Sequence, residues 1–171
     1  VPGLAANISI FENIKLSEEF YSVHFLEWMI PDAQETLQDY AKRLCEKIKQ
    51  YDVVKSVLVA SQQHHPMTEF RKACPEVATS ATFREVLAFY SLKKMRLVKL
   101  YRSPAVAFQV PDDDRIINSE MFEALRSFNL RIHVWTIDNS NDMRRLLGMG
   151  VDGLITNETA LLQRILNESI N

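Results

Sequence analysis

Residues 132–155 read IHVWTIDNSNDMRRLLGMGVDGLI, and this stretch decides the fold class. It predicts a strand over residues 132–137, then a helix that Asn139 with Asp142 can cap, and a second strand over residues 151–155. Gly148 and Gly150 suit the end of that helix, because many helices end at a residue with positive φ. The second strand is short and apolar, which is typical of a strand buried on both faces. The stretch is therefore a parallel strand, helix and strand unit.

The rest of the chain repeats this alternation of strand and helix. Pro31 and Asp32 open a predicted helix with Glu35 placed for a capping box, and Thr82 with Glu85 caps a later helix. Further strands are predicted over residues 23–29, 55–61, 77–80 and 105–110. Strands that alternate with helices indicate an α/β fold with a parallel sheet, which a barrel would close. Residues 1–22 carry the weakest pattern, so the predicted domain is residues 23–171.

Length and composition narrow the class of protein. A chain of 171 residues is one domain long, whereas an eightfold β/α barrel typically needs about 250 residues. The net charge of −2 shows no basic surplus, so we expect no nucleic-acid partner. No run approaches the ~20 apolar residues of a transmembrane helix, and the first residues lack the plan of a signal peptide. We expect a cytoplasmic protein, with an extracytoplasmic location as the alternative.

The two cysteines, Cys45 and Cys74, show no metal-ligand spacing. We expect both to be reduced and buried as small hydrophobic side chains rather than joined in a disulfide. The chain begins with Val rather than Met, which suits a processed or partial product.

Two words in the chain carry a more specific signal, namely HVWTIDN at 133–139 and GVDGLITN at 150–157. They resemble the last two strands of the glycerophosphodiester phosphodiesterase family. The similarity extends to CPEVATSAT at 74–82, AFQVP at 107–111 and, more faintly, SVLVASQ at 56–62. The resemblance implies a TIM-type β/α barrel, of which this chain would form the C-terminal two thirds. It also implies a hydrolase of lipid metabolism that cleaves small glycerophosphodiesters to glycerol 3-phosphate and an alcohol, with a divalent cation, Mg or Ca, as cofactor.

The family has an EIK-like word on an early strand, and LEWM at 26–29 aligns with it. The resemblance makes Glu27 the candidate metal ligand. Met29 then replaces the family's lysine near the phosphate, which removes a cation from that site. The alternative for Glu27 is a half-exposed strand carboxylate with no ligand.

Other candidate site residues stand at the carboxyl ends of predicted strands, where a β/α barrel places its reacting groups. In the resemblance, Trp135 forms an apolar wall of the substrate cleft. From their places on the predicted strands, Gln109, which could offer an amide to a glycerol hydroxyl, and Ser61 are candidate substrate-binding residues. The alternative for Trp135 and Gln109 is a purely structural place inside the barrel. The loop histidines His64 and His65 are weak catalytic candidates, since an imidazole can move protons near neutral pH.

The family's HRG, ENT and HD words do not occur in these 171 residues. In the family those words supply both acid/base histidines, the phosphate-binding arginine and most metal ligands. We therefore expect this chain by itself to be inactive. The alternative function is a non-catalytic barrel remnant that binds a ligand or a partner.

Two features of the sequence suggest binding to another surface, either a membrane or a second copy of the chain. Residues 92–102 place Lys93, Lys94, Arg96, Lys99 and Arg102 among apolar residues, which suits an anionic membrane surface or the solvated face of an outer helix. A sheet that does not close leaves unpaired edges, so we also expect self-association or a missing N-terminal barrel segment, unless residues 1–22 supply closure.

Overall fold

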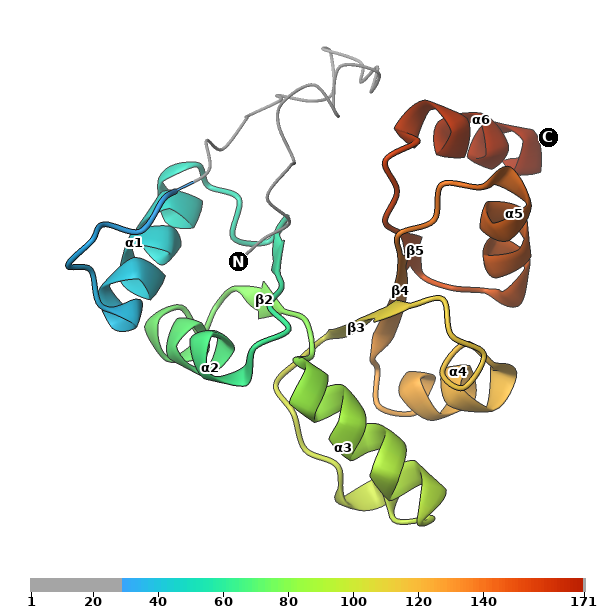
Figure 1. The fold of residues 1–171 in the computed structure, drawn as a ribbon, viewed down its shortest axis with the longest axis horizontal. Helices are drawn as coiled ribbons and strands as arrows, with labels where there is room; N and C mark the ends of the chain where they lie inside the picture. Colours follow the sequence, from blue (N-terminus) through green and yellow to red (C-terminus); the bar gives the residue numbers. More distant parts are fainter. Residues whose placement is uncertain (1–28, 171) are drawn as a thin grey trace. The chain divides into compact units, whose positions relative to one another are not determined.

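The computed structural model describes residues 29–170, which divide into two compact units, 29–108 and 109–170 (Figure 1). Each unit is described by itself below. The predictions for residues 1–22, for most of the strand at 23–29 and for Glu27 lie outside the described residues.

The first unit alternates helices with short parallel strands. Strands β1 and β2 pair in parallel, with Leu58 opposite Ala78, and Ser80 makes a further parallel bridge to Ala107. Strands β1 and β2 are shorter than the pattern predicts, although both lie within their predicted ranges. The elements are α1 (Leu37–Gln50), β1 (Leu58–Val59), α2 (His64–Ala73), β2 (Ala78–Thr79), α3 (Phe83–Lys94), the 3-10 helix η2 (Val98–Leu100) and the start of β3 (Ala107–Pro111).

Helix α1 begins later than the sequence predicts. Thr36 is its N-cap, and its hydroxyl accepts a hydrogen bond from the backbone N–H of Asp39. Glu35 instead accepts from the N–H of Asp32 in the turn before the helix and binds Arg43 at 2.6 Å. Glu35 therefore stabilises the turn before α1, together with Arg43 of that helix, and does not cap the helix from within. The predicted helix start at Pro31 is wrong. The capping box of α3 is confirmed, since Thr82 and Glu85 bind each other's backbone N–H groups.

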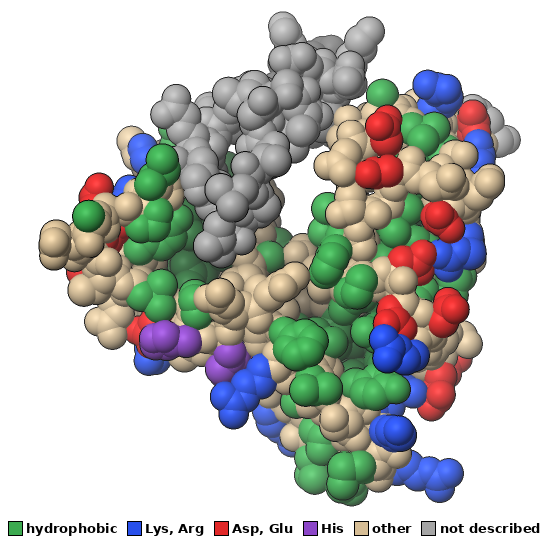
Figure 2. Space-filling view, viewed as in Figure 1, with side chains coloured by type: hydrophobic (Ala, Val, Ile, Leu, Met, Phe, Trp, Pro, Cys, Tyr) green, Lys and Arg blue, Asp and Glu red, His purple; other side chains and the backbone are tan. Residues whose placement is uncertain are grey.

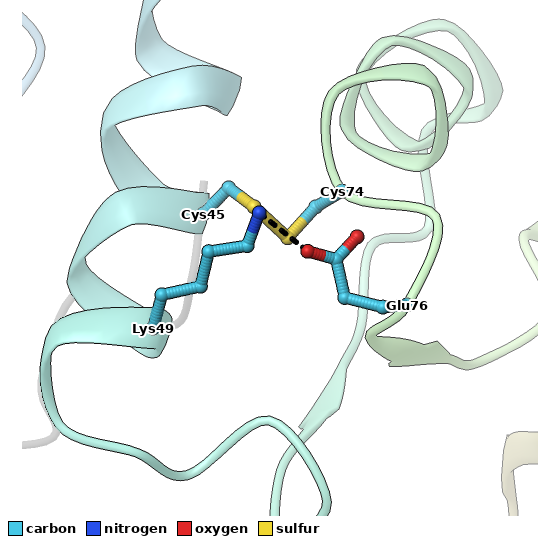
Figure 3. Close-up of a disulfide and its surroundings, with 4 residues drawn as sticks. All are labelled: Cys45, Lys49, Cys74 and Glu76. Atoms are coloured by element: carbon cyan, nitrogen blue, oxygen red, sulfur yellow. Dashed lines mark ion pairs between the residues drawn. A yellow bond between two sulfur atoms is a disulfide. The ribbon is translucent and has the colours of Figure 1, made fainter.

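The expectation that the cysteines are reduced is wrong. Cys45 on α1 and Cys74 after α2 form a disulfide, with Cα atoms 5.6 Å apart (Figure 3). Both residues belong to the apolar cluster between these helices, with 3% and 0% of their surfaces exposed. The packing of α1 against α2 brings together two side chains that are 29 residues apart, which spacing alone does not reveal. Lys49 and Glu76 form an ion pair beside the disulfide.

The second unit is a three-stranded sheet with three helices. The strand order is β3-β4-β5, and β4 pairs with β5 in parallel, with His133 opposite Gly153. Its core includes Val134, Met143 and Leu146, each with 0% of its surface exposed. After β3 the elements are α4 (Ser119–Arg126), β4 (Arg131–Trp135), α5 (Ser140–Met149), β5 (Gly153–Leu154) and α6 (Thr159–Ile170).

Helix α5 begins and ends as its residues predict, with one exception. The Asn139 side chain accepts hydrogen bonds from the N–H groups of Asn141 and Asp142, so its role as the cap is confirmed. Gly150 ends the helix at φ 85°, a conformation that costs a residue with a Cβ atom. Gly148 lies inside the helix without a positive φ, so the prediction for this glycine is wrong.

The fold class is parallel α/β, as predicted. Strands alternate with helices along residues 29–170, and every strand pairing recorded there is parallel. A closed barrel is not seen among these residues, because their five strands fall short of the eight that such a barrel requires. No helix in this part of the chain is long and apolar enough to span a membrane.

Candidate functional site

One face of the second unit's sheet carries the predicted site residues. Side chains alternate along β3 and β4, so Gln109, His133 and Trp135 share a face and are each half-buried. The opposite face is apolar and buried, with Val110 2% and Val134 0% exposed. The structure therefore brings Gln109 and Trp135 onto one surface, where a polar amide and an indole ring stand beside an imidazole.

The imidazole of His133 is held from two sides. Gln109 Nε2 lies 3.5 Å from His133 Nδ1, at the limit of a hydrogen bond. A Cβ atom at Gly153 would lie 3.0 Å from His133 Cδ2, so a larger residue there would force the ring to move by a few tenths of an ångström. Burial lowers the pKa of His133, against the opposing effect of the Asp152 carboxylate. Near neutral pH the ring is thus uncharged and offers one donor and one acceptor nitrogen.

Asp138 joins the carboxyl ends of β4 and β5. Its carboxylate accepts hydrogen bonds from the Thr156 hydroxyl at 2.9 Å, from the Asn157 N–H at 2.8 Å and from the Asn157 side-chain amide at 2.9 Å. The hydrogen bond from the Asn157 side-chain amide is the largest cause that lowers the pKa of Asp138 below its usual value, which favours the ionised carboxylate. The sequence interpretation missed Asp138, although it lies inside the word HVWTIDN at a strand end.

Asp152 has a structural role. Its carboxylate accepts from the N–H of Ile132 at 2.8 Å, while its own N–H donates to the Ile132 carbonyl at 2.9 Å. These two bonds tie the start of β5 to the start of β4. The carboxylate is therefore directed at the backbone at the amino ends of the strands.

The remaining described candidates lie in the first unit. The Ser61 hydroxyl donates to the Gln63 carbonyl and accepts from the Gln63 N–H at 3.1 Å, which makes a local turn before α2. His64 Nδ1 lies 3.1 Å from the Thr82 hydroxyl, and the neighbouring His65 is exposed. His64 is therefore linked to the cap of α3, and His65 points to solvent.

His64 also lines a hollow in the first unit with a volume of about 310 Å³. Its wall combines the apolar Leu92 and Leu100 with the cationic Arg84 and Arg102. Glu85 also lines the hollow, but its carboxylate is engaged by other groups.

Those groups form a buried polar network that the sequence interpretation missed. Arg71 binds both oxygens of Glu85, at 2.7 and 3.2 Å, and donates to the Thr79 hydroxyl and the Ser80 carbonyl. Ser103 also donates to Glu85, at 2.8 Å. Burial alone would raise the pKa of Glu85, but the hydrogen bonds from Arg71, Thr82 and Ser103 outweigh it and lower that pKa to about 2.

A divalent cation does not fit the described side chains. Among them, one group of three potential ligands lies close together, Cys45, Cys74 and Glu76, with ligand atoms within 4.8 Å of one another. Both sulfur atoms are joined in the disulfide, so they offer no thiolate. Mg²⁺ and Ca²⁺ also prefer oxygen ligands. The predicted ligand, Glu27, lies outside the described residues.

Comparisons with known proteins agree on one family. Residues 9–161 match the model of the Glycerophosphoryl diester phosphodiesterase family. A glycerophosphodiester phosphodiesterase of Caldanaerobacter subterraneus subsp. tengcongensis is 23% identical over 121 residues, which are 71% of this chain and 46% of that protein. A glycerophosphodiester phosphodiesterase of Bacillus subtilis is 38% identical over 53 residues, which are 31% of this chain and 18% of that protein.

Solved structures show the same fold. A putative glycerophosphoryl diester phosphodiesterase from Silicibacter pomeroyi has a TM-score of 0.57 at 18% identity, over 78% of this chain and 45% of that one. An Oleispira antarctica phosphodiesterase, in complex with the product sn-glycerol-3-phosphate, has a TM-score of 0.57 at 14% identity, over 77% of this chain and 50% of that one. The match thus covers about half the length of the Caldanaerobacter protein and of these two structures.

Proposed function

Because the chain belongs to the glycerophosphoryl diester phosphodiesterase family, we propose that it is part of a hydrolase that cleaves glycerophosphodiesters to glycerol 3-phosphate and an alcohol. The observation that carries this proposal is the family match over residues 9–161. The product bound to the Oleispira antarctica neighbour supports a glycerol phosphate as the kind of small molecule recognised. The same match does not favour the alternative of a non-catalytic module.

In this proposal the shared face of β3 and β4 binds the glycerol end of the substrate. Trp135 offers an apolar wall, since its half-buried indole stands at the end of β4. Gln109 offers an amide to a glycerol hydroxyl. The uncharged His133 beside it would orient that amide, because their side-chain nitrogens are 3.5 Å apart. Ser61, which follows β1 in the first unit, stays a separate candidate for substrate binding.

The cofactor is also a proposal. By resemblance, Glu27 would hold a divalent cation, Mg²⁺ or Ca²⁺, that stabilises charge on the phosphoryl oxygens when bound. A cation that binds only the folded chain should raise its melting temperature, and Glu27→Gln should abolish the gain. An unchanged gain in Glu27→Gln would remove this residue from the site. Self-association likewise stays a prediction, which light scattering on the purified chain tests.

Binding of sn-glycerol 3-phosphate, measured by isothermal titration calorimetry on the full 171-residue chain, tests the proposed face. We expect Gln109→Ala to weaken binding roughly tenfold, since a lost hydrogen bond costs about 1 kcal/mol or more. Gln163→Ala is the matched control, because Gln163 is exposed on α6 in the same unit. Equal affinities for these two variants would show that Gln109 lies outside the substrate site.

Activity offers a second test. We expect no glycerol 3-phosphate release from glycerophosphocholine by these residues alone, because the family's HRG and HD words are absent from them. Turnover that follows the protein through stringent purification would overturn the assigned roles. It would direct attention to His64 and His65.

A further inference from the structure

The segment from Val86 to Pro111 has an unusual charge composition. It contains five cationic residues and not one Asp or Glu, in a chain whose net charge is −2. The cations are Lys93, Lys94, Arg96, Lys99 and Arg102. The segment runs from α3 through η2 to β3, within the first unit except for its last three residues.

The same segment exposes large apolar side chains. In the described part of the chain, ten large hydrophobic residues are exposed, and five of them lie in this segment. Met95 is 65% exposed, Leu100 64% and Leu87 51%. Figure 2 shows hydrophobic and basic side chains sharing the surface over α3, at the bottom of the view. We call the residues Leu87, Lys94, Met95, Arg96, Lys99 and Leu100 the α3–η2 surface.

The cations of this surface are available. Lys94, Arg96 and Lys99 are exposed and form no ion pair with another described residue. The nearest acid on α3, Glu85, is buried and bound to Arg71. No described acidic side chain therefore pairs with these three cations, and their positive charge is open to a partner.

A rigid base supports the surface. Phe89 packs edge to face on Tyr101 and Phe108, with ring centroids 4.9 and 5.3 Å apart. All three rings are buried, with exposures of 0%, 4% and 1%. The apolar side chains on the outside are thus presented on an ordered element rather than left over from a poorly packed one.

We propose that the α3–η2 surface docks on a bilayer of anionic phospholipids. Exposed aliphatic side chains flanked by cations fit the interfacial zone of a bilayer, where the former enter the acyl boundary and the latter meet lipid phosphates. A second copy of the chain fits poorly, because a two-fold interface would place these like charges against each other. Single-stranded nucleic acid would favour several exposed aromatic rings, whereas the apolar side chains of the α3–η2 surface are Leu and Met, and Phe83 at the start of α3 is a single ring.

Vesicle flotation of the full chain tests the proposal. With about one third phosphatidylglycerol in phosphatidylcholine we expect binding that high salt weakens, and with phosphatidylcholine alone far less. The triple substitution Lys94→Gln, Arg96→Gln and Lys99→Gln should lower the partition coefficient on the order of a hundredfold, at roughly fivefold per cation. The matched control neutralises three exposed cations elsewhere, Lys55, Arg131 and Arg164, and should have a much smaller effect.

The contribution of the exposed apolar side chains is tested separately. Met95→Ser with Leu100→Ser should weaken binding at every salt concentration, because it removes insertion and leaves the charge unchanged. Lys94→Arg with Lys99→Arg should keep binding, which separates loss of charge from loss of folding. Equal weakening by the test and control triples would overturn the proposal, as would equal binding to neutral vesicles. A dimer without vesicles that the test triple dissociates would assign the surface to a second copy instead.

Discussion

Replacing Glu85 with glutamine isolates the charge of the buried network in the first unit. The Glu85 side chain is 10% exposed and that of Arg71 is 14% exposed, so water screens their ion pair weakly. Glutamine keeps the shape and one acceptor oxygen but removes the negative charge. Arg71 is then left partly buried with an unpaired positive charge.

The magnitude follows from the pKa of Glu85. The folded state lowers it from 4.5 to about 2. At 1.36 kcal/mol per pKa unit, this difference is worth about 3 kcal/mol of folding free energy. Because the folded pKa is the lower one, the stabilisation is complete above pH 4.5 and is lost as the pH falls toward 2. Breaking a buried pair by removing one partner costs a similar amount, about 3–5 kcal/mol.

Urea unfolding followed by far-UV circular dichroism at pH 7 and at pH 3 measures the effect. We expect Glu85→Gln to lower the free energy of unfolding by about 3 kcal/mol at pH 7, and clearly less at pH 3. Glu168→Gln is the control, because its ion pair with Arg144 is about half exposed on both sides and should contribute less than about 1 kcal/mol. A loss from Glu85→Gln that is the same at both pH values would refute the electrostatic reasoning.

Two further predictions concern the disulfide and the glycine beside His133. Changing Cys45 and Cys74 to serine should lower the free energy of unfolding by about 3.6 kcal/mol on the chain-entropy model, and an unchanged urea midpoint in dithiothreitol would contradict it. Gly153→Ala should destabilise by about 1–3 kcal/mol and shift the imidazole resonances of His133 in NMR spectra, since the new Cβ atom would clash with the ring. Gly148→Ala, with no neighbour within 4 Å, should be neutral or stabilising, and equal losses at both glycines would exclude the clash.

Several features follow from residues a few positions apart, so the sequence predicts them directly. The capping box of Thr82 and Glu85 and the cap at Asn139 need only a side-chain acceptor and a nearby backbone N–H. Gly150 tolerates positive φ because it lacks a Cβ atom. The alternation along β3 and β4 places Gln109 and Trp135 on one face, as their spacing in each strand implies.

The start of α1 shows where local signals compete. Both Glu35 and Thr36 are residue types that suit the first turn of a helix. The sequence pattern by itself predicts a helix that begins at Pro31. In the structure the guanidinium of Arg43, eight residues after Glu35, binds the Glu35 carboxylate in the turn before the helix. Thr36 then becomes the cap.

Contacts between residues far apart in the chain were decided by tertiary structure. The Cys45–Cys74 disulfide exists because α1 packs on α2, and Arg71 reaches Glu85 because α2, β2 and α3 meet. Asp138 binds Asn157 because parallel pairing aligns the ends of β4 and β5. The periodicity of apolar residues shows which face of a helix or strand is buried. Which polar side chains meet depends on how whole helices and strands pack against one another. No short window of sequence contains that information.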